Sequence, residues 1–154
     1  MIANMEKYRN KYLSTIIEYS KNNNLYKKCY IYELLWALEL NLISWEDIPP
    51  GFEDTYDLPH KRDYGIDLLS ISFDKTVQVK MYGEKSLITW NDISKYNTYS
   101  SDILNIKHMT IATTMVSKID SMVIRLFKND NKHILRKDFD TMIQEVVTDY
   151  KPIV

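Results

Sequence analysis

The chain has 154 residues, 45% of them hydrophobic, and this length and composition predict one globular domain with a single core. Its 20 Lys and Arg residues nearly balance 21 Asp and Glu residues, so the net charge of −1 excludes the strong positive field of a histone-like nucleic-acid binder. The only cysteine, Cys29, excludes a disulfide framework and a thiolate zinc cluster. No apolar signal core or membrane-spanning run is visible, and we expect a soluble, intracellular protein.

Two amphipathic helices are expected first, over residues 4–22 and about 29–41. Apolar residues recur at helical spacing in the first until the polar run "KNNN" ends the pattern. In the second, Leu34, Leu35 and Leu38 form a buried stripe flanked by Glu33 and Glu39. Both glutamates are therefore expected beside the core.

The middle of the chain predicts a short helical turn and then a β-hairpin. In "SWEDIPPG", Ser44 and Asp47 form a variant of the capping box, and the two prolines end the turn. Residues 66–73 and 76–82 are rich in Ile, Leu, Val, Phe and Tyr, which indicates a hairpin that turns at Asp74-Lys75. A short strand at 87–88 and a helix capped by Thr89 follow.

The last third of the chain predicts two strands and a C-terminal helix. "HMTIATTMV" and "MVIRLF" have the composition of strands, and "KDFDTMIQEVVTDY" has helical spacing. The basic run "KHILRK" is typical of a solvated segment, although it could contact nucleic acid. The order of elements predicts one α/β domain.

The hairpin sets polar side chains on one face. Gln78 and Lys80 are two residues apart and must project from the same face of their strand, whereas Val79 points the other way, into the core. With the predicted turn, Asp67 lies opposite Tyr82 and diagonally next to Lys80, so Asp67, Gln78 and Lys80 are expected to converge. A slip of one residue in register would turn the Gln78 and Lys80 face away.

Such a cluster could hydrolyse phosphodiesters. A carboxylate offers a hard oxygen to Mg²⁺, and the metal can polarise a phosphate and lower the pKa of a bound water. A nearby ammonium can position that water and offset the charge of the transition state. The bland alternative is that Asp67 is a turn residue and that Gln78 and Lys80 lie on the solvated side of an edge strand.

A family resemblance bears on this choice. "DYGIDLLSIS" followed by "VQVKMY" resembles the D-x-G-[IV]-D…Q-x-K signature of the Mrr-like branch of the PD-(D/E)xK restriction-endonuclease-like nucleases. With "LPHKR" before it and "ITW" after it, the stretch is similar in particular to N-terminal nuclease-like domains of helicases from large DNA viruses. The resemblance covers about residues 29–115. It implies a mixed central α/β sheet flanked by helices, extra N-terminal helices and DNA endonuclease activity that depends on Mg²⁺ or Mn²⁺.

Residue by residue, the resemblance implies that Asp67 ligates the metal, Lys80 is the catalytic lysine and Val79 lends its backbone carbonyl. Gln78 stands where the wider family more often has Glu or Asp, although the Mrr-like branch itself resembles this pattern, and it would orient the cluster. Because this removes one anionic ligand, metal binding would depend on a helix glutamate, for which Glu33 is the first choice. Glu39 and Glu18 are the alternatives, and all three could instead be solvated helix flanks.

The remaining expectations concern DNA and partners. Four cations bracket the proposed site and could contact the DNA backbone: Lys61, Arg62, Lys85 and Lys95. Asp63 and Gly65 complete the motif, the glycine by permitting a tight entry into the strand. A homodimer would supply the two sites that two-strand cleavage needs, and a helicase or recombination protein is a partner suggested by analogy with domain fusions. The rival prediction is an inactive nuclease-fold module that binds nucleic acid or a protein.

Overall fold

The computed structural model describes residues 5–49, 51–52 and 64–149. None of the helices in these ranges is long and apolar enough to cross a membrane. The helices and short strands follow one another along the chain in this order: α1 (Met5–Lys21), α2 (Lys28–Leu40), β1 (Ile43–Ser44), the 3₁₀ turn η1 (Trp45–Asp47), β2 (Leu68–Leu69), β3 (Lys75–Lys80), β4 (Leu87–Ile88), α4 (Trp90–Asn97), the π-helical turn η2 (Thr98–Ile103), β5 (His108–Thr113), β6 (Lys118–Ile119), α5 (Ser121–Leu126), β7 (Lys132–Arg136) and α6 (Phe139–Asp149).

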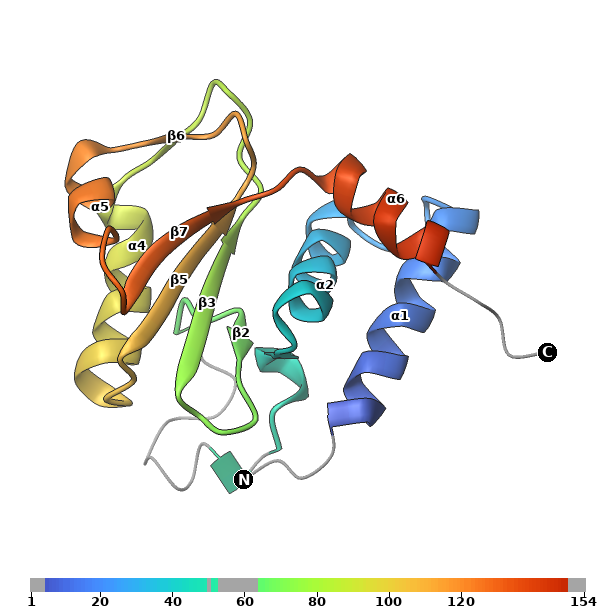
Figure 1. The fold of residues 1–154 in the computed structure, drawn as a ribbon, viewed down its shortest axis with the longest axis horizontal. Coiled ribbons are helices and arrows are strands. Elements are labelled where there is room, and N and C mark those ends of the chain that lie inside the picture. The colour runs from blue at the N-terminus through green and yellow to red at the C-terminus, as the bar shows by residue number, and fades with distance from the viewer. Residues whose placement is uncertain (1–4, 50, 53–63, 150–154) are drawn as a thin grey trace.

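The fold is a mixed α/β sheet covered by helices on both faces. Five strands pair in the order β1-β2-β3-β5-β7, antiparallel from β1 to β3 and parallel from β3 to β7. Helices α1, α2 and α6 lie on one side of this sheet and α4 and α5 on the other (Figure 1). The parallel pairing of β3 with β5 needs a crossover connection, which α4 supplies. The predicted fold class is confirmed.

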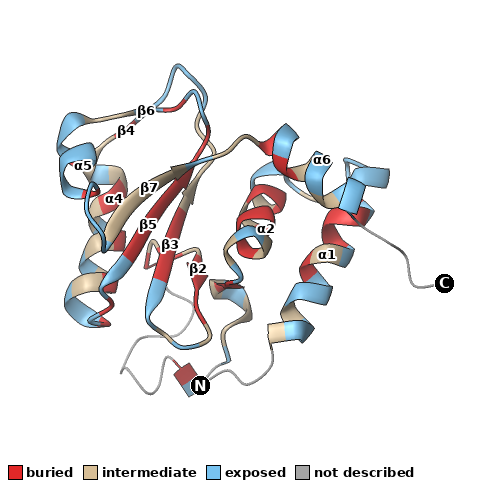
Figure 2. Cartoon of the chain, viewed as in Figure 1, coloured by how far each residue is buried: buried red, intermediate tan, exposed pale blue. Residues whose placement is uncertain are grey.

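Each face of the sheet has its own apolar cluster, as the buried positions in Figure 2 indicate. On the side of α1, α2 and α6, Val77 and Ala112 pack against Leu34 and Leu35. On the side of α4, the neighbouring strand residue Ile111 belongs to the second cluster, with Ile93, Tyr96 and Met109 among its members. Side chains alternate along a strand, so successive residues of β3 and β5 face different clusters.

Tyr96 ties α4 to both central strands. Its ring is fully buried, its hydroxyl donates to the Thr76 carbonyl (2.8 Å), and it accepts from the Thr110 N–H (3.0 Å). Burial is the largest cause that raises the pKa of Tyr96, so the hydroxyl stays protonated and can donate. The prediction that Thr89 caps this helix is confirmed, because Thr89 and Asp92 form a reciprocal capping box.

Two elements differ from the predictions. The prediction of a strand over 122–127 is wrong, since residues 122–126 belong to helix α5, which Asp120 begins by accepting a hydrogen bond from the Met122 N–H (3.1 Å). The run "KHILRK", for which no strand was predicted, contains strand β7, which pairs in parallel with β5 at the edge of the sheet and stays partly exposed. A six-residue apolar run suits either a strand or a helix, and a strand at the sheet edge can carry basic side chains.

The hairpin has a wider turn than predicted. Leu68 pairs with Val77 and Leu69 with Thr76, so the turn spans Ser70 to Lys75 rather than centring on Asp74-Lys75. The Ser70 N–H donates to the Lys75 carbonyl (3.0 Å), and the Ser70 hydroxyl binds the Asp74 side chain (2.7 Å). These side-chain bonds close a longer loop that the apolar pattern does not reveal. The predicted pairing of Asp67 with Tyr82 is therefore wrong.

Candidate functional site

Asp67 binds the backbone of β3 just beyond the end of the β2 ladder. Its N–H donates to the Val77 carbonyl (3.0 Å), and its Oδ2 accepts from the Val79 N–H (2.7 Å). Its own carbonyl accepts from the Trp45 N–H (2.9 Å), which joins it to the start of η1. Backbone N–H groups of a strand point along the plane of the sheet, so the Asp67 carboxylate lies near that plane, between the two helical layers.

Gly65 permits the approach of this segment to α4. Its φ is +72°, and an added Cβ would lie 2.9 Å from the Tyr96 backbone nitrogen. Both features exclude a larger residue without local rearrangement. The role predicted for this glycine, a tight entry into the strand, agrees with its geometry, whereas Asp63 lies outside the described residues.

A cavity of about 250 Å³ opens beside the Asp67 carboxylate. It brings together carboxylates from three parts of the chain: Glu33 of α2, Glu46 of η1 and Asp67. The lining is completed by Cys29, Tyr30, Val79 and Met81. Val79 thus faces this cavity as well as the apolar cluster of α2, rather than the core alone.

The pKa of the Glu33 carboxyl is raised in this cavity. Burial is the largest cause that raises its pKa, to about 8, and the negative charges of Asp67 and Glu46 add to the effect. The Ser44 hydroxyl, 3.3 Å from Glu33 Oε2, lowers this pKa, while a side-chain hydrogen bond with Asp67 raises it. The raised pKa favours the protonated form of Glu33, which can donate the hydrogen bond to the Asp67 carboxylate.

The segment that carries Ser44 and Glu46 is held by α1. Tyr12 accepts from the Ser44 N–H (2.8 Å) and donates to Asp47 Oδ2 (2.7 Å). The Ser44 hydroxyl makes no capping bond to η1, so the predicted capping role is wrong, and it donates to Glu33 instead. Sequence reasoning missed Glu46, because its approach to Glu33 depends on this contact between elements far apart in the chain.

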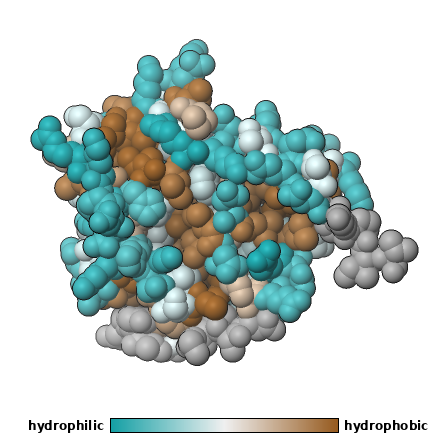
Figure 3. All heavy atoms as spheres, viewed as in Figure 1, coloured by the Kyte–Doolittle hydropathy of each residue, from teal (hydrophilic) through white to brown (hydrophobic). Residues whose placement is uncertain are grey.

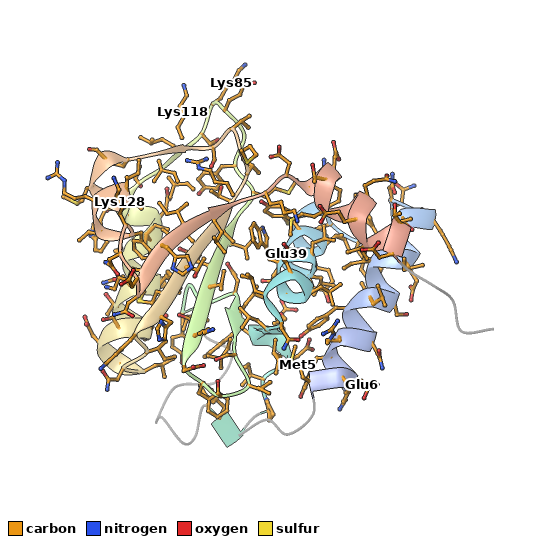
Figure 4. All side chains as sticks on the ribbon, viewed as in Figure 1. Met5, Glu6, Glu39, Lys85, Lys118 and Lys128 are labelled. Atoms are coloured by element: carbon orange, nitrogen blue, oxygen red, sulfur yellow. The ribbon has the colours of Figure 1, made fainter. Side chains whose placement is uncertain are left out.

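The alternatives to Glu33 lie elsewhere. Glu39 accepts a hydrogen bond from Lys137 Nζ (3.1 Å), and Glu18 accepts one from the Tyr26 hydroxyl (3.3 Å). Figure 4 shows Glu39 on the α6 side of α2. Of the three glutamates considered from the sequence, the structure brings Glu33 to Asp67.

Gln78 and Lys80 flank the residue that Asp67 binds but do not line the cavity. Gln78 is 6% exposed and pairs with Ile111, which belongs to the α4-side cluster. Lys80 is half-buried, with its Nζ 5.6 Å from the centre of the Tyr82 ring. The expectation that Asp67 shares one face with Gln78 and Lys80 needs correction: its carboxylate lies at the sheet plane and reaches the cavity on the α2 side.

The atoms of Gln78 add a second observation. Within the described part of the chain, Gln78 Oε1 is buried without a hydrogen-bond partner. An unsatisfied buried acceptor costs free energy, about 1–3 kcal/mol. Gln78 precedes Val79, whose amide binds Asp67, but its side chain lies toward the α4-side cluster, so among the described residues this oxygen is an unpartnered acceptor on the other face of β3.

The predicted DNA contacts are only partly described. Lys61 and Arg62 lie outside the described residues. Lys85 is exposed in the connection from β3 to β4 and projects from one end of the molecule (Figure 4), and Lys95 is exposed on α4. Neither of these two lysines lines the cavity beside Asp67.

The described residues do not form a ready-made metal cage. Among them, no group of three His, Cys, Asp or Glu side chains is arranged to hold a metal ion. Two hydrogen-bonded carboxylates, Glu33 and Asp67, are what the cavity offers, with Glu46 in its wall. The carbonyl of Val79 points to the same edge of β3 as its N–H, that is, toward Asp67, because both groups of one strand residue share an edge.

Comparison with known families assigns the chain. A family model described as "Restriction endonuclease" (Mrr_cat_2) matches residues 41–154, about three quarters of the sequence. The chain belongs to this restriction endonuclease family. Neither a curated protein nor a solved structure matches the chain. The match includes Asp67, Gln78 and Lys80 but begins after α2, so Glu33 lies outside it.

Proposed function

We propose that this member of the restriction endonuclease family is a metal-dependent DNA endonuclease that hydrolyses phosphodiester bonds. The observation that carries the proposal is the Asp67 carboxylate, bound to the Val79 N–H between Gln78 and Lys80 and hydrogen-bonded to Glu33. The family match, which covers this stretch, supports a nuclease.

The donor set fits Mg²⁺. This ion takes oxygen ligands and is usually held by one or two carboxylates while keeping several waters. Asp67 and Glu33 would hold it, with the Val79 carbonyl as a neutral ligand, and Mn²⁺ could replace it. When bound, the metal supplies a polarised phosphate and a water of lowered pKa.

Three side chains of the chain would supply the other roles in catalysis: Glu33, Lys80 and Gln78. Glu33 must release its proton when it ligates a cation, so binding becomes tighter as pH rises. Lys80 would position the attacking water and offset charge in the transition state. Gln78 would orient the cluster from its place beside Val79 on β3, the role that the resemblance implies for it.

The substrate is proposed to be DNA, held along its backbone by Lys85, Lys95, Lys61 and Arg62. A homodimer would supply the second active site for two-strand cleavage. A helicase or recombination partner, the finer similarity to viral helicase domains and an intracellular location stay predictions.

A second candidate function is an inactive nuclease-fold module that binds nucleic acid or a protein. It is favoured by Gln78, which occupies the position where the wider PD-(D/E)xK superfamily more often has an acid, and by the lack of a three-ligand group among the described residues. It predicts DNA binding without cleavage.

Cleavage of plasmid, linear and branched DNA by the wild type and by Lys80→Ala, with Mg²⁺, Mn²⁺ or EDTA, separates the two. The endonuclease predicts metal-dependent cleavage that Lys80→Ala lowers at least a hundredfold, within the range of one charge-stabilising donor. Lys128→Ala, an exposed lysine at another part of the surface (Figure 4), is the matched control and should cleave normally. Equal cleavage by wild type and Lys80→Ala, or none by either, would exclude the enzyme.

A further inference from the structure

The loop between β5 and β6 exposes two large apolar side chains. Met115 is 59% exposed and Val116 is 53% exposed, and they stand next to each other at the loop tip. Leu87 of β4, which pairs with Lys118 of β6, is a third exposed apolar residue at 48%. In Figure 3 apolar surface lies beside the hydrophilic tip at the end of the molecule that carries β6. Adjacent exposed apolar side chains of this size often mark a binding surface.

This loop is held in place by polar contacts. Nη1 of Arg136 lies 2.9 Å from the Thr114 carbonyl oxygen and 2.8 Å from that of Ser117. The Met115 N–H donates to Asp138 Oδ1 (2.9 Å), which ties the tip to the start of α6. The two apolar side chains are thus presented by an ordered backbone, which lowers the entropy lost when they bind a partner.

The same loop is joined to the end of β3. The Thr113 hydroxyl donates to the Lys80 carbonyl (2.7 Å), and the Thr114 hydroxyl donates to the Tyr82 carbonyl (2.6 Å). Met115 and Val116 therefore sit close to the end of the strand that carries the proposed catalytic lysine. A ligand that reaches Lys80 along β3 would meet them next.

Two exposed lysines stand near these apolar side chains. Lys118 follows Val116 by two residues and pairs with Leu87 of β4. Lys85 precedes Leu87 by two residues. Both lysines are exposed and project from the same end of the molecule (Figure 4); the acids near them include Glu84, next to Lys85 in the chain, and Asp138, which binds the Met115 N–H. Protein–protein interfaces are depleted in lysine, which argues against a protein partner here. In DNA, charged phosphates flank apolar stacked bases, so two lysines beside an apolar tip complement that arrangement.

We propose that Met115 and Val116 form an apolar wedge that unstacks one base step of duplex DNA, while Lys85 and Lys118 hold the flanking phosphates. The inference rests on the proposed DNA substrate and names how that substrate is deformed. Apolar side chains inserted between bases partly unstack them and kink the duplex, and the added contacts offset that cost. Specificity then comes from how easily a sequence deforms.

The test is binding of duplexes that contain 2-aminopurine, followed by anisotropy and by the fluorescence rise that accompanies unstacking, in EDTA and with Mg²⁺. For Met115→Ser/Val116→Ser we expect roughly tenfold weaker binding and loss of the fluorescence rise, with an unchanged salt dependence. For Lys85→Ala/Lys118→Ala the slope of log affinity against log salt should fall by about 0.9 per lysine. Leu25→Ser, with 52% exposure in the connection from α1 to α2, is the control and should behave as the wild type.

The outcomes separate this inference from the proposed function. If the wedge variant binds and unstacks DNA like the wild type, the wedge is wrong while the DNA substrate stands. If the wild type binds no DNA with or without Mg²⁺, both fail. If light scattering shows a dimer that the wedge variant dissociates, and DNA binding is unchanged, the two side chains form a protein interface and the wedge is overturned.

Discussion

The Glu33 side chain should make the metal-free fold less stable as pH rises. Its pKa is raised from 4.5 to about 8, chiefly by burial. At about 1.36 kcal/mol for each pH unit, that difference amounts to on the order of 5 kcal/mol. Because the folded pKa is the higher one, this stability is fully present below about pH 4.5 and is lost as pH rises toward about 8. Glu33→Gln carries no charge at any pH and should not show this loss.

The measurement is urea unfolding in EDTA between pH 5 and pH 9. The free energy of unfolding of the wild type should fall by about 4 kcal/mol more than that of Glu33→Gln over this range. The reason is that roughly three of these pH units lie between the unfolded and the folded pKa of Glu33. Glu39→Gln, on the same helix but half-exposed beside Lys137, is the control and should follow the wild type. If wild type and Glu33→Gln show parallel pH profiles, Glu33 is not a buried acid coupled to Asp67, and its role as a metal ligand loses its main support.

Three further predictions concern the metal, the tight turn and the central strands. Mg²⁺ should raise the Tm in a thermal melt, and Asp67→Ala should abolish that shift; a persisting shift would place the ion elsewhere. Gly65→Ala should lower the free energy of unfolding by at least about 1 kcal/mol, because of its φ of +72° and the Tyr96 backbone, and an unchanged urea midpoint would contradict this contact. Tyr96→Phe should cost about 1–3 kcal/mol, since the Thr110 N–H and Thr76 carbonyl lose a buried partner, and a neutral effect in the same assay would mean that water replaces the hydroxyl.

The candidate site illustrates how far local patterns extend. Strand alternation predicts that Gln78 and Lys80 share a face, and the spacing depends on no other part of the chain. The turn from Ser70 to Lys75, by contrast, is closed by the Ser70 and Asp74 side chains. A different turn length changes every cross-strand partner, and that is why the pairing predicted for Asp67 is wrong.

The sequence by itself determined the features that arise within one turn or one strand. Helical spacing predicted α1, α2 and α6, and the Thr89 and Asp92 pair predicted the start of α4, because these signals are local. Only the tertiary structure decided that α5 is a helix and β7 a strand, and that Glu33, rather than Glu39 or Glu18, meets Asp67. The approach of Glu33 to Asp67 depends on α1, because Tyr12 binds the Ser44 N–H while the Ser44 hydroxyl binds Glu33 of α2. Contacts between elements so far apart in the chain leave no periodic trace in the sequence, and they create the hydrogen bond between Glu33 and Asp67.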